Sequence, residues 1–197
     1  MNEFKSLTDE QLVELYSKGE NAAFGELLSR YQSKLFTYIA FIVRNEVLAE
    51  DIFQETFVKA ITTIKQGRYA ESGRFGAWLT RIAHNLIVDS FRHDKGDFIV
   101  SNDESEVDLF NNAELCEENI ETSMVNSQVL SDVRRLIGAL PEVQREVVFM
   151  RYYQNLSFRE IADATGVSIN TALGRMRYAI INMRTMAQEK GISLELS

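Results

Sequence analysis

An acidic, aperiodic stretch at residues 94–127 constrains the fold of this chain more than any other feature. It holds ten acidic residues and one lysine, a net charge of −9, so the rest of the chain carries +1 of the total −8. Because like charges repel and no apolar period is sustained, we expect an extended linker with at most a short helical turn. A charged linker cannot pass through a common core, so the sequence predicts two small domains.

Both flanking segments have apolar residues at helical spacing and no alternation typical of strands, so we predict an all-α fold. The N-terminal domain is expected at 6–93 and the C-terminal domain at 128–187. A capping signal at 6–10 predicts the first helix, in which Leu12, Leu15 and Tyr16 recur at helical spacing. Further helices are expected at about 21–43, 46–65, 74–92, 128–138, 141–153, 157–164 and 168–186, with Pro141 in a first turn.

Composition and motifs exclude several classes of function. The longest apolar run, 35–43, is shorter than the ~20 residues of a membrane span, and the N-terminus lacks a secretory signal, so we expect a cytoplasmic protein without membrane insertion. The lone Cys116 and the two histidines, His84 and His93, offer neither a disulfide nor a zinc site. No phosphate-binding loop or hydrolase motif occurs, so we expect no enzymatic activity, no cofactor and no small-molecule substrate.

Residues 157–184 have the form of a helix-turn-helix. Ser157 and Glu160 form a capping box, Gly166 stands where the turn needs a left-handed residue, and Ser168 caps the second helix. Its inward stripe is expected to be Ile169, Ala172, Met176, Ala179 and Met183. The opposite face can enter a DNA major groove, and the candidate DNA-binding residues are Ser168, Asn170, Thr171, Gly174, Arg175, Arg177 and Tyr178. The alternative is an ordinary helical hairpin with a solvated polar face.

The helix expected at 46–65 has an acidic face. Its buried stripe is expected to be Phe53, Phe57, Ala60, Ile61 and Ile64, and its reverse side carries Asp51, Gln54, Glu55 and Val58. The two carboxylates lie one turn apart and reinforce each other, and an apolar neighbour suits docking onto a basic helical partner. A solvated helix face is the alternative. Acid–base catalysis is a third, but no nucleophile or metal ligand accompanies the pair.

The helix expected at 74–92 has a basic face. Its core side is expected to be Phe75, Leu79, Ile82, Ala83 and Leu86. Another side carries Arg74, Arg81, Asn85 and Arg92, spaced so that they fall within about 40° of one another, and Trp78 borders them. Guanidinium groups, an amide and an indole along one helix form a phosphate track with a base reader and a stacking surface. Alternatively, Arg81 and Arg92 pair with Asp89 and Trp78 belongs to the core.

Taken together, these segments resemble the sigma-70 family of bacterial RNA polymerase specificity subunits, in its extracytoplasmic-function (ECF) group. AEDIFQETFVKA (49–60) resembles the family's core-polymerase-binding helix, and FGAWLTRIAHNLIVDSFRH (75–93) resembles its −10 recognition helix. The stretch at 140–180 resembles its −35-binding domain. The order and spacing of the three motifs, with an acidic linker between them, make the resemblance specific.

The resemblance implies a protein that binds core RNA polymerase and directs promoter-specific initiation. Asp51, Gln54, Glu55 and Val58 would contact the clamp helices of the β′ subunit. Asn85 and the loop at 65–72 would capture an unstacked base of the −10 element of promoter DNA, whose melting costs a few kcal/mol per step. The second domain would read the −35 element and touch the β flap, the linker would thread toward the polymerase active site, and an anti-sigma factor would be a further partner.

The sequence departs from the family pattern within the second helix of the helix-turn-helix. Many members have Lys-Ser where this chain has Leu173 and Gly174, and Arg where it has Tyr178. The recognition helix is therefore less basic, and its target sequence should differ. The alternative function is an autonomous helix-turn-helix regulator that binds a palindromic site as a dimer.

Overall fold

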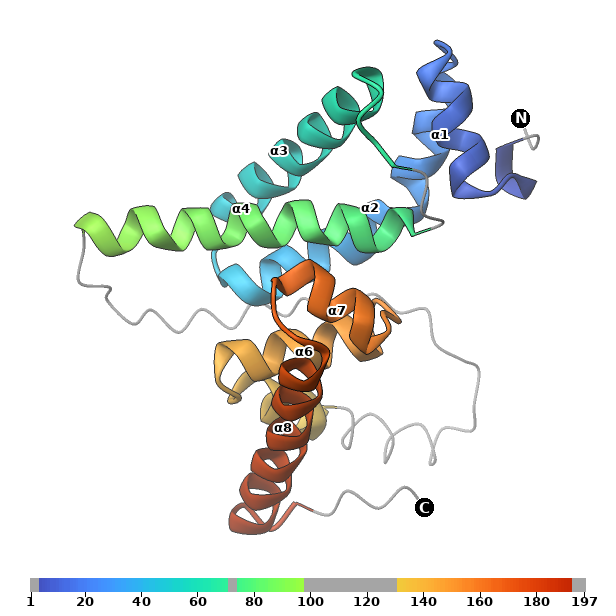
Figure 1. Cartoon of the computed structure of the whole chain (residues 1–197). Coiled ribbons are helices and arrows are strands. Elements are labelled where there is room, and N and C mark those ends of the chain that lie inside the picture. Colours follow the sequence, from blue (N-terminus) through green and yellow to red (C-terminus); the bar gives the residue numbers. More distant parts are fainter. Residues whose placement is uncertain (1–3, 71–73, 98–130, 193–197) are drawn as a thin grey trace. The chain divides into compact units, whose positions relative to one another are not determined.

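The computed structural model describes residues 4–70, 74–97 and 131–192, and within these residues it contains helices and no strand, as the sequence predicts. The chain divides into two compact units. Residues 98–130 lie outside the described part of the chain, so the expected linker and the domain bounds at 93 and 128 stay predictions. Figure 1 shows the helices of both units.

The N-terminal unit contains a short 3-10 helix, η1 (Phe4–Ser6), and four α-helices: α1 (Asp9–Ser17), α2 (Asn21–Val43), α3 (Glu46–Lys65) and α4 (Phe75–Asp97). The bounds of α2 and α3 are those predicted. The prediction for α4 was wrong at its end, since this helix continues to Asp97 and takes in the first residues of the expected linker. Apolar periodicity stops near Arg92, whereas backbone hydrogen bonding does not depend on it.

Side chains at the helix ends explain where these helices begin. Thr8 caps α1 through a capping box, in which Gln11 N donates to Thr8 Oγ1 (3.4 Å) and Thr8 N donates to Gln11 Oε1 (2.8 Å). Asn45 caps α3 by accepting a hydrogen bond from Leu48 N (3.1 Å). Arg44, in a left-handed conformation with φ 55°, separates α2 from α3.

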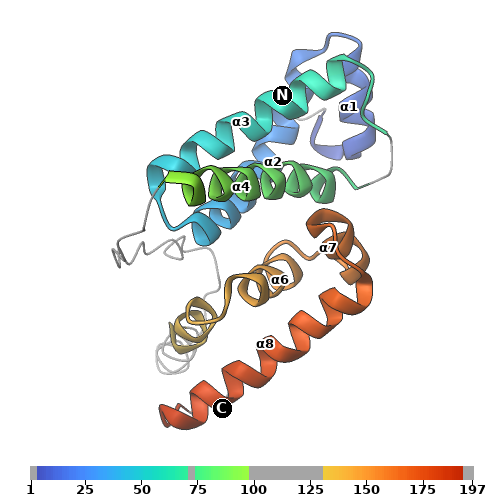
Figure 2. The same ribbon diagram turned by 60° about the vertical axis from the view of Figure 1, so that its left-hand side comes forward.

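The core of the N-terminal unit lies around α2, which packs against α1, α3 and α4 (Figure 2). Its apolar run at 35–43 is buried, apart from half-buried Phe36 and Thr37. Burying a large apolar side chain contributes about 1.5–3 kcal/mol. The largest fully buried side chains of this unit are Leu12, Leu27, Tyr38, Ile39, Ile64, Phe75, Leu79 and Ile87.

The predicted buried stripes need correction at three positions in this unit. Phe53 and Ile61 of α3 are half-buried, and the buried face is instead completed by Ala49, Ile52 and Thr56. Phe53 packs edge-on against Phe36 of α2, with ring centroids 5.6 Å apart, so it lies at the rim of the α2–α3 contact. In α4, Ile82 is half-buried and Ile87 is buried in its place.

The C-terminal unit contains helical residues 131–138 followed by α6 (Glu142–Tyr152), α7 (Phe158–Thr165) and α8 (Ile169–Glu189). Pro141 is the N-cap residue of α6 and not part of its first turn, because its ψ of 144° is extended. α6 packs against α8, and Asn182 Nδ2 donates to Gln144 Oε1 (2.8 Å) across this contact.

The core of the C-terminal unit draws on every one of these helices, with buried Leu136, Val147, Phe149, Met150, Ile161, Ala172 and Ala179. Two members of the stripe predicted for α8 do not belong to it. Ile169 is 45% exposed and Met183 is half-buried, while Ala187, one turn further on, is buried. α8 therefore extends beyond the predicted end and continues its packed face.

Candidate polymerase and nucleic-acid interfaces

The turn of the helix-turn-helix has the predicted local chemistry. Ser157 N donates to Glu160 Oε2 (2.7 Å) and Glu160 N donates to Ser157 Oγ (3.3 Å), which closes the capping box that opens α7. Gly166 has φ 67°, in the left-handed region, and Val167 N donates to Ala162 O (3.1 Å) across the turn. Ser168 then caps α8 by accepting from Thr171 N (3.0 Å).

α8 presents most of the candidate −35 residues to solvent. Asn170, Thr171, Arg177 and Tyr178 are exposed, whereas Gly174 and Arg175 are half-buried at the edge of the same face. The hydroxyls of Ser168 and Thr171 lie 2.8 Å apart, so both candidates also take part in capping the helix. The exposed N-terminal end of α8 leaves backbone N–H groups that favour an anionic partner such as phosphate.

Two apolar residues lie on this face: Leu173, which the sequence shows as a departure from the family pattern, and Ile181, which the sequence analysis missed. Leu173 and Ile181 are both 44% exposed, and they line an open groove along α8 with Phe158, Met176, Arg177, Ile180 and Arg184. Each of these two residues lies four positions from Arg177, about 40° away on a helical wheel, which was the signal available in the sequence. The recognition face is therefore more apolar than its arginines indicate.

α4 brings the candidate −10 residues onto one solvent-facing side. Arg74, directly before α4, and Arg81, Asn85 and Arg92 within it are all exposed. Arg92 and Asp89 form the pair that the alternative interpretation expected, but at 3.6 Å with both side chains largely exposed, so it contributes little. The sequence interpretation of an exposed basic face therefore fits the structure.

Trp78 borders this basic face and is half-buried. Its ring packs edge-on against Tyr69, with centroids 4.7 Å apart, and lies 5.5 Å from the ring of Phe75. The sequence left two alternatives for Trp78, an exposed stacking surface or a core residue. The structure places it between them, partly in the core and partly at the surface. Lys65–Ala70 of the loop expected to capture a base are described, and residues 71–73 lie outside the described part.

α3 presents Asp51, Gln54, Glu55 and Val58 on an exposed face, and Val58 is 60% exposed. The structure modifies the expectation that the two carboxylates reinforce each other, because Glu55 forms an ion pair with Lys59 (3.1 Å) that offsets part of its charge. Val47, which the sequence analysis missed, is 72% exposed. It lies eleven residues before Val58, three helical turns away on the same side, so two valines flank Asp51.

Two kinds of feature are absent from residues 4–70, 74–97 and 131–192. None of their helices is long and apolar enough to cross a membrane. No cluster of three or more histidine, cysteine or acidic side chains could hold a metal ion there. The stretch with most of the acidic linker residues lies outside these ranges.

Comparison with known proteins connects both units to one family. Residues 27–96 match Sigma-70 region 2, and residues 130–173 match Sigma-70, region 4. The chain is 30% identical over 191 residues to the ECF RNA polymerase sigma-E factor of Haemophilus influenzae, covering 94% of this chain and 96% of that protein. It is also 35% identical over 179 residues to the ECF RNA polymerase sigma factor BldN of Streptomyces coelicolor. That match covers 90% of this chain and 64% of BldN.

Two solved structures share the fold. CnrH in complex with the cytosolic domain of CnrY aligns with a TM-score of 0.63 at 22% identity, covering 92% of this chain and 97% of that chain. RpoE of Bartonella quintana in complex with the anti-sigma factor NepR aligns with a TM-score of 0.61 at 20% identity, covering 84% and 96%. Near-complete coverage of the sigma-E factor, together with region matches on both units, shows that this chain belongs to the ECF group of the sigma-70 family of RNA polymerase sigma factors.

Proposed function

We propose that this protein binds core RNA polymerase and directs promoter-specific initiation through three separate surfaces. The observation that carries the proposal is the separation of charge within one small unit. The exposed face of α3 carries the acidic Asp51, and that of α4 carries Arg74, Arg81 and Arg92. A protein partner and a nucleic acid can therefore be bound on different helices.

The acidic face of α3 is proposed to bind the clamp helices of the polymerase β′ subunit. Asp51, Gln54, Glu55 and Val58 would form the contact, and exposed Val47 would extend it. The two valines lie about 16 Å apart along the helix, so they favour a partner that is itself a long, basic and partly apolar helix. The charged groups would set orientation and the apolar groups would supply affinity.

The basic face of α4 is proposed to hold the −10 element. Arg74, Arg81 and Arg92 would contact phosphates, Asn85 would read a base, and Trp78 would stack on an unpaired one. Since unstacking a base costs a few kcal/mol, capture at Trp78 and Asn85 would favour melting at sequences that open readily.

The C-terminal unit is proposed to bind the −35 element through α8 and to touch the β flap. Arg175, Arg177 and Asn170 would approach base edges, while Thr171, Tyr178 and Ser168 would contact phosphates near the N-terminal end of α8. Gly174 has no side chain and would let the helix approach the groove closely. Exposed Leu173 stands where a basic residue would otherwise read DNA, so the −35 sequence should differ from that of relatives.

The remaining partners follow from the same proposal. RpoE was solved in complex with the anti-sigma factor NepR, and CnrH in complex with the cytosolic domain of CnrY, so we propose an anti-sigma protein as a partner of this chain. The protein would act as a polymerase subunit in the cytoplasm and not as an enzyme in its own right. The acidic linker would thread toward the polymerase active site.

The proposal is tested by reconstitution with purified core polymerase. The wild-type chain should co-purify with core and start transcripts at specific promoters that core alone does not use. Asp51→Arg with Glu55→Arg should abolish co-purification while the fold survives, since both side chains are exposed. Glu14→Arg with Glu189→Arg, two exposed acids outside α3, is the control with the same change in net charge.

Two results would count against the proposal. If the α3 variant co-purified with core polymerase as well as the wild type does, the acidic face of α3 would not be the docking surface. Binding of a palindromic DNA by the free protein as a dimer, insensitive to added core, would identify an autonomous regulator instead.

A further inference from the structure

We propose that Tyr31 and Gly76, held in place by Asp9, position the ring of Trp78 and thereby determine how well the melted −10 strand is captured. This inference rests on the proposed function, because it concerns the stacking surface of α4. None of the three residues lies among the candidate DNA contacts. They are positioning residues, and they connect α1 and α2 to the start of α4.

Tyr31 is connected to Trp78 through an aromatic cluster formed by Tyr31, Tyr69, Phe75 and Trp78. The rings of Tyr31 and Phe75 are 5.3 Å apart, those of Phe75 and Trp78 are 5.5 Å apart, and those of Tyr69 and Trp78 are 4.7 Å apart. Tyr69 also meets Phe75 at 6.0 Å. Phe75 is buried, so a displacement of Tyr31 is passed to Trp78 by packed rings and not across solvent.

Helix α2 approaches the first turn of α4 closely. A Cβ atom added at Gly76 would lie 2.6 Å from Cε1 of Tyr31. Two non-bonded carbon atoms cannot approach that closely. Any larger residue at 76 must therefore displace either the Tyr31 ring or the start of α4. Gly76 is therefore required by the position of Tyr31, and the Tyr31 ring in turn packs at a tilt against Phe75, the residue before Gly76.

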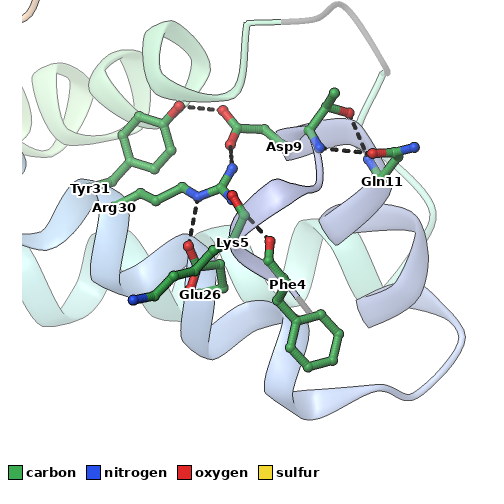
Figure 3. Close-up of polar contacts among 8 residues, drawn as sticks. Phe4, Lys5, Asp9, Gln11, Glu26, Arg30 and Tyr31 are labelled. Atoms are coloured by element: carbon green, nitrogen blue, oxygen red, sulfur yellow. Dashed lines mark hydrogen bonds and ion pairs between the residues drawn. The ribbon is translucent and has the colours of Figure 1, made fainter. Parts of the chain in front are cut away.

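A set of polar contacts fixes Tyr31, as Figure 3 shows. The Tyr31 hydroxyl donates to Oδ2 of Asp9, and Arg30 Nη1 donates to Oδ1 of the same carboxylate (2.9 Å). Arg30 also binds Glu26 Oε1 through Nε (3.0 Å) and the carbonyls of Phe4 and Lys5 through Nη2 (3.1 Å each). The Tyr31 ring cannot rotate away without breaking this network.

Asp9 is the first residue of α1, so the start of that helix fixes the Tyr31 ring. The capping box of Thr8 and Gln11 fixes the first turn of α1, to which Asp9 belongs. Trp78 is half-buried, and only its outer part is available to a base. Stacking depends on the placement of that ring, so a shift of Tyr31 changes nucleic-acid capture without touching the acidic face of α3.

The experiment uses holoenzyme reconstituted from the full chain and core polymerase on a promoter mapped for the wild-type protein. Gly76→Ala is compared with Gly25→Ala, a matched control in α2 where an added Cβ meets nothing within 4 Å. Open complexes are measured by permanganate reactivity of −10 thymines, and affinity for core is measured in parallel. Tyr31→Phe, which keeps the ring and removes the hydroxyl, is the milder variant and serves if Gly76→Ala does not fold.

We expect Gly76→Ala to reduce open-complex formation by roughly fivefold to a hundredfold, the range that follows from losing one base–aromatic stack. Affinity for core should stay within about twofold of the wild type. Tyr31→Phe should give a smaller loss of the same kind, and Gly25→Ala none. With Tyr31→Ala already present, Gly76→Ala should cost nothing more, because the atom that its Cβ meets is gone.

Three outcomes would overturn the inference. Equal open-complex formation by Gly76→Ala, Tyr31→Phe and Gly25→Ala would show that Trp78 is not positioned from α2. Additive effects of Tyr31→Ala and Gly76→Ala would show that the two residues do not act through the proposed contact. A loss of core affinity as large as the loss of open complexes would show general damage to the N-terminal unit. If the wild-type holoenzyme itself makes no promoter-specific open complexes, the proposed function fails, which is a different result from active but insensitive variants.

Discussion

Two glycines of the helix-turn-helix should respond oppositely to the same substitution. Gly166 lies in the turn with φ 67°, and Gly174 lies within α8, and an added Cβ at either position meets nothing within 4 Å. The two positions therefore offer the same free space to an added methyl group, and they differ only in backbone conformation. Left-handed backbone costs an L-residue about 1–2 kcal/mol, whereas a helical glycine is about 0.5–1 kcal/mol worse than alanine.

Gly166→Ala should therefore destabilise the C-terminal unit by about 1 kcal/mol, after allowing for the lower entropy of the unfolded alanine chain. Gly174→Ala should stabilise it by about 0.5–1 kcal/mol. For a unit of this size, each kcal/mol shifts Tm by roughly 4–8 °C. Gly166→Asn should destabilise the C-terminal unit less than Gly166→Ala does, because asparagine tolerates the left-handed region better than alanine.

The assay is thermal unfolding of the full chain followed by far-ultraviolet circular dichroism. The single tryptophan, Trp78, belongs to the N-terminal unit, so its fluorescence transition is an internal control that neither substitution should move. If both glycine variants shift Tm in the same direction, the conformational argument is wrong. Gly174→Ala has a second readout, since a more stable α8 that binds the −35 element less tightly would show that Gly174 is needed for close approach to DNA.

Three further predictions concern other surfaces. Burial raises the pKa of Tyr31 above its ordinary value of 10.0, and the bond to Asp9 raises it further. The stability that the protonated hydroxyl contributes is present below pH 10 and lost as the pH rises above it, so urea unfolding between about pH 8 and 11 should show a decline that Tyr31→Phe reduces. Arg177→Ala should relax discrimination at one −35 position by about 1–3 kcal/mol in holoenzyme binding to promoter variants, whereas a uniform loss with a smaller salt slope would identify a phosphate contact. Val47→Ser, an exposed change that removes the apolar group without adding charge, should preserve Tm yet weaken core binding about fivefold, and an unchanged affinity would exclude Val47 from the interface.

Local sequence signals predicted the helices well where caps and periodicity coincide. Ser168 accepts from Thr171 N and Gly166 adopts the left-handed turn, and both were predicted from the sequence because capping depends on neighbours within four residues. The bounds of α2 and α3 follow for the same reason. α4 continued past its prediction because the signal used was apolar spacing, which ends before the hydrogen-bonded backbone does.

Burial at the edges of helix faces could not be predicted in this way. Phe53 and Ile169 were assigned to core stripes by angle alone, yet Phe53 is half-buried beside Phe36 and Ile169 is 45% exposed. An apolar residue at the border of a stripe is buried only if a neighbouring helix covers that border. That depends on crossing angles and helix ends, which the sequence of one helix does not contain.

The candidate site shows the same division between local and non-local information. The ion pair of Glu55 with Lys59 follows from i,i+4 spacing and was available in the sequence. The contact of Gly76 with Tyr31 joins residues 45 positions apart, and only the packing of α2 on α4 reveals it. A glycine within a helix is otherwise unfavourable, so its presence at 76 has an explanation only after the fold is known.

Charge distribution connects the fold to the proposed function. The net charge of −8 comes from the acidic stretch at 94–127, and the repulsion between this stretch and phosphates opposes binding of the free chain to DNA. Each basic face is short: α4 carries Arg81 and Arg92, with Arg74 directly before it, and α8 carries Arg175, Arg177 and Arg184. Neither face alone neutralises enough phosphates to overcome that repulsion. DNA binding would then require core polymerase to cover the acidic α3 face and to hold both basic faces on one promoter, which raises their effective concentration for each other. On this argument the acidity of the chain is itself a device for specificity, because it keeps the free protein off DNA until the polymerase is present.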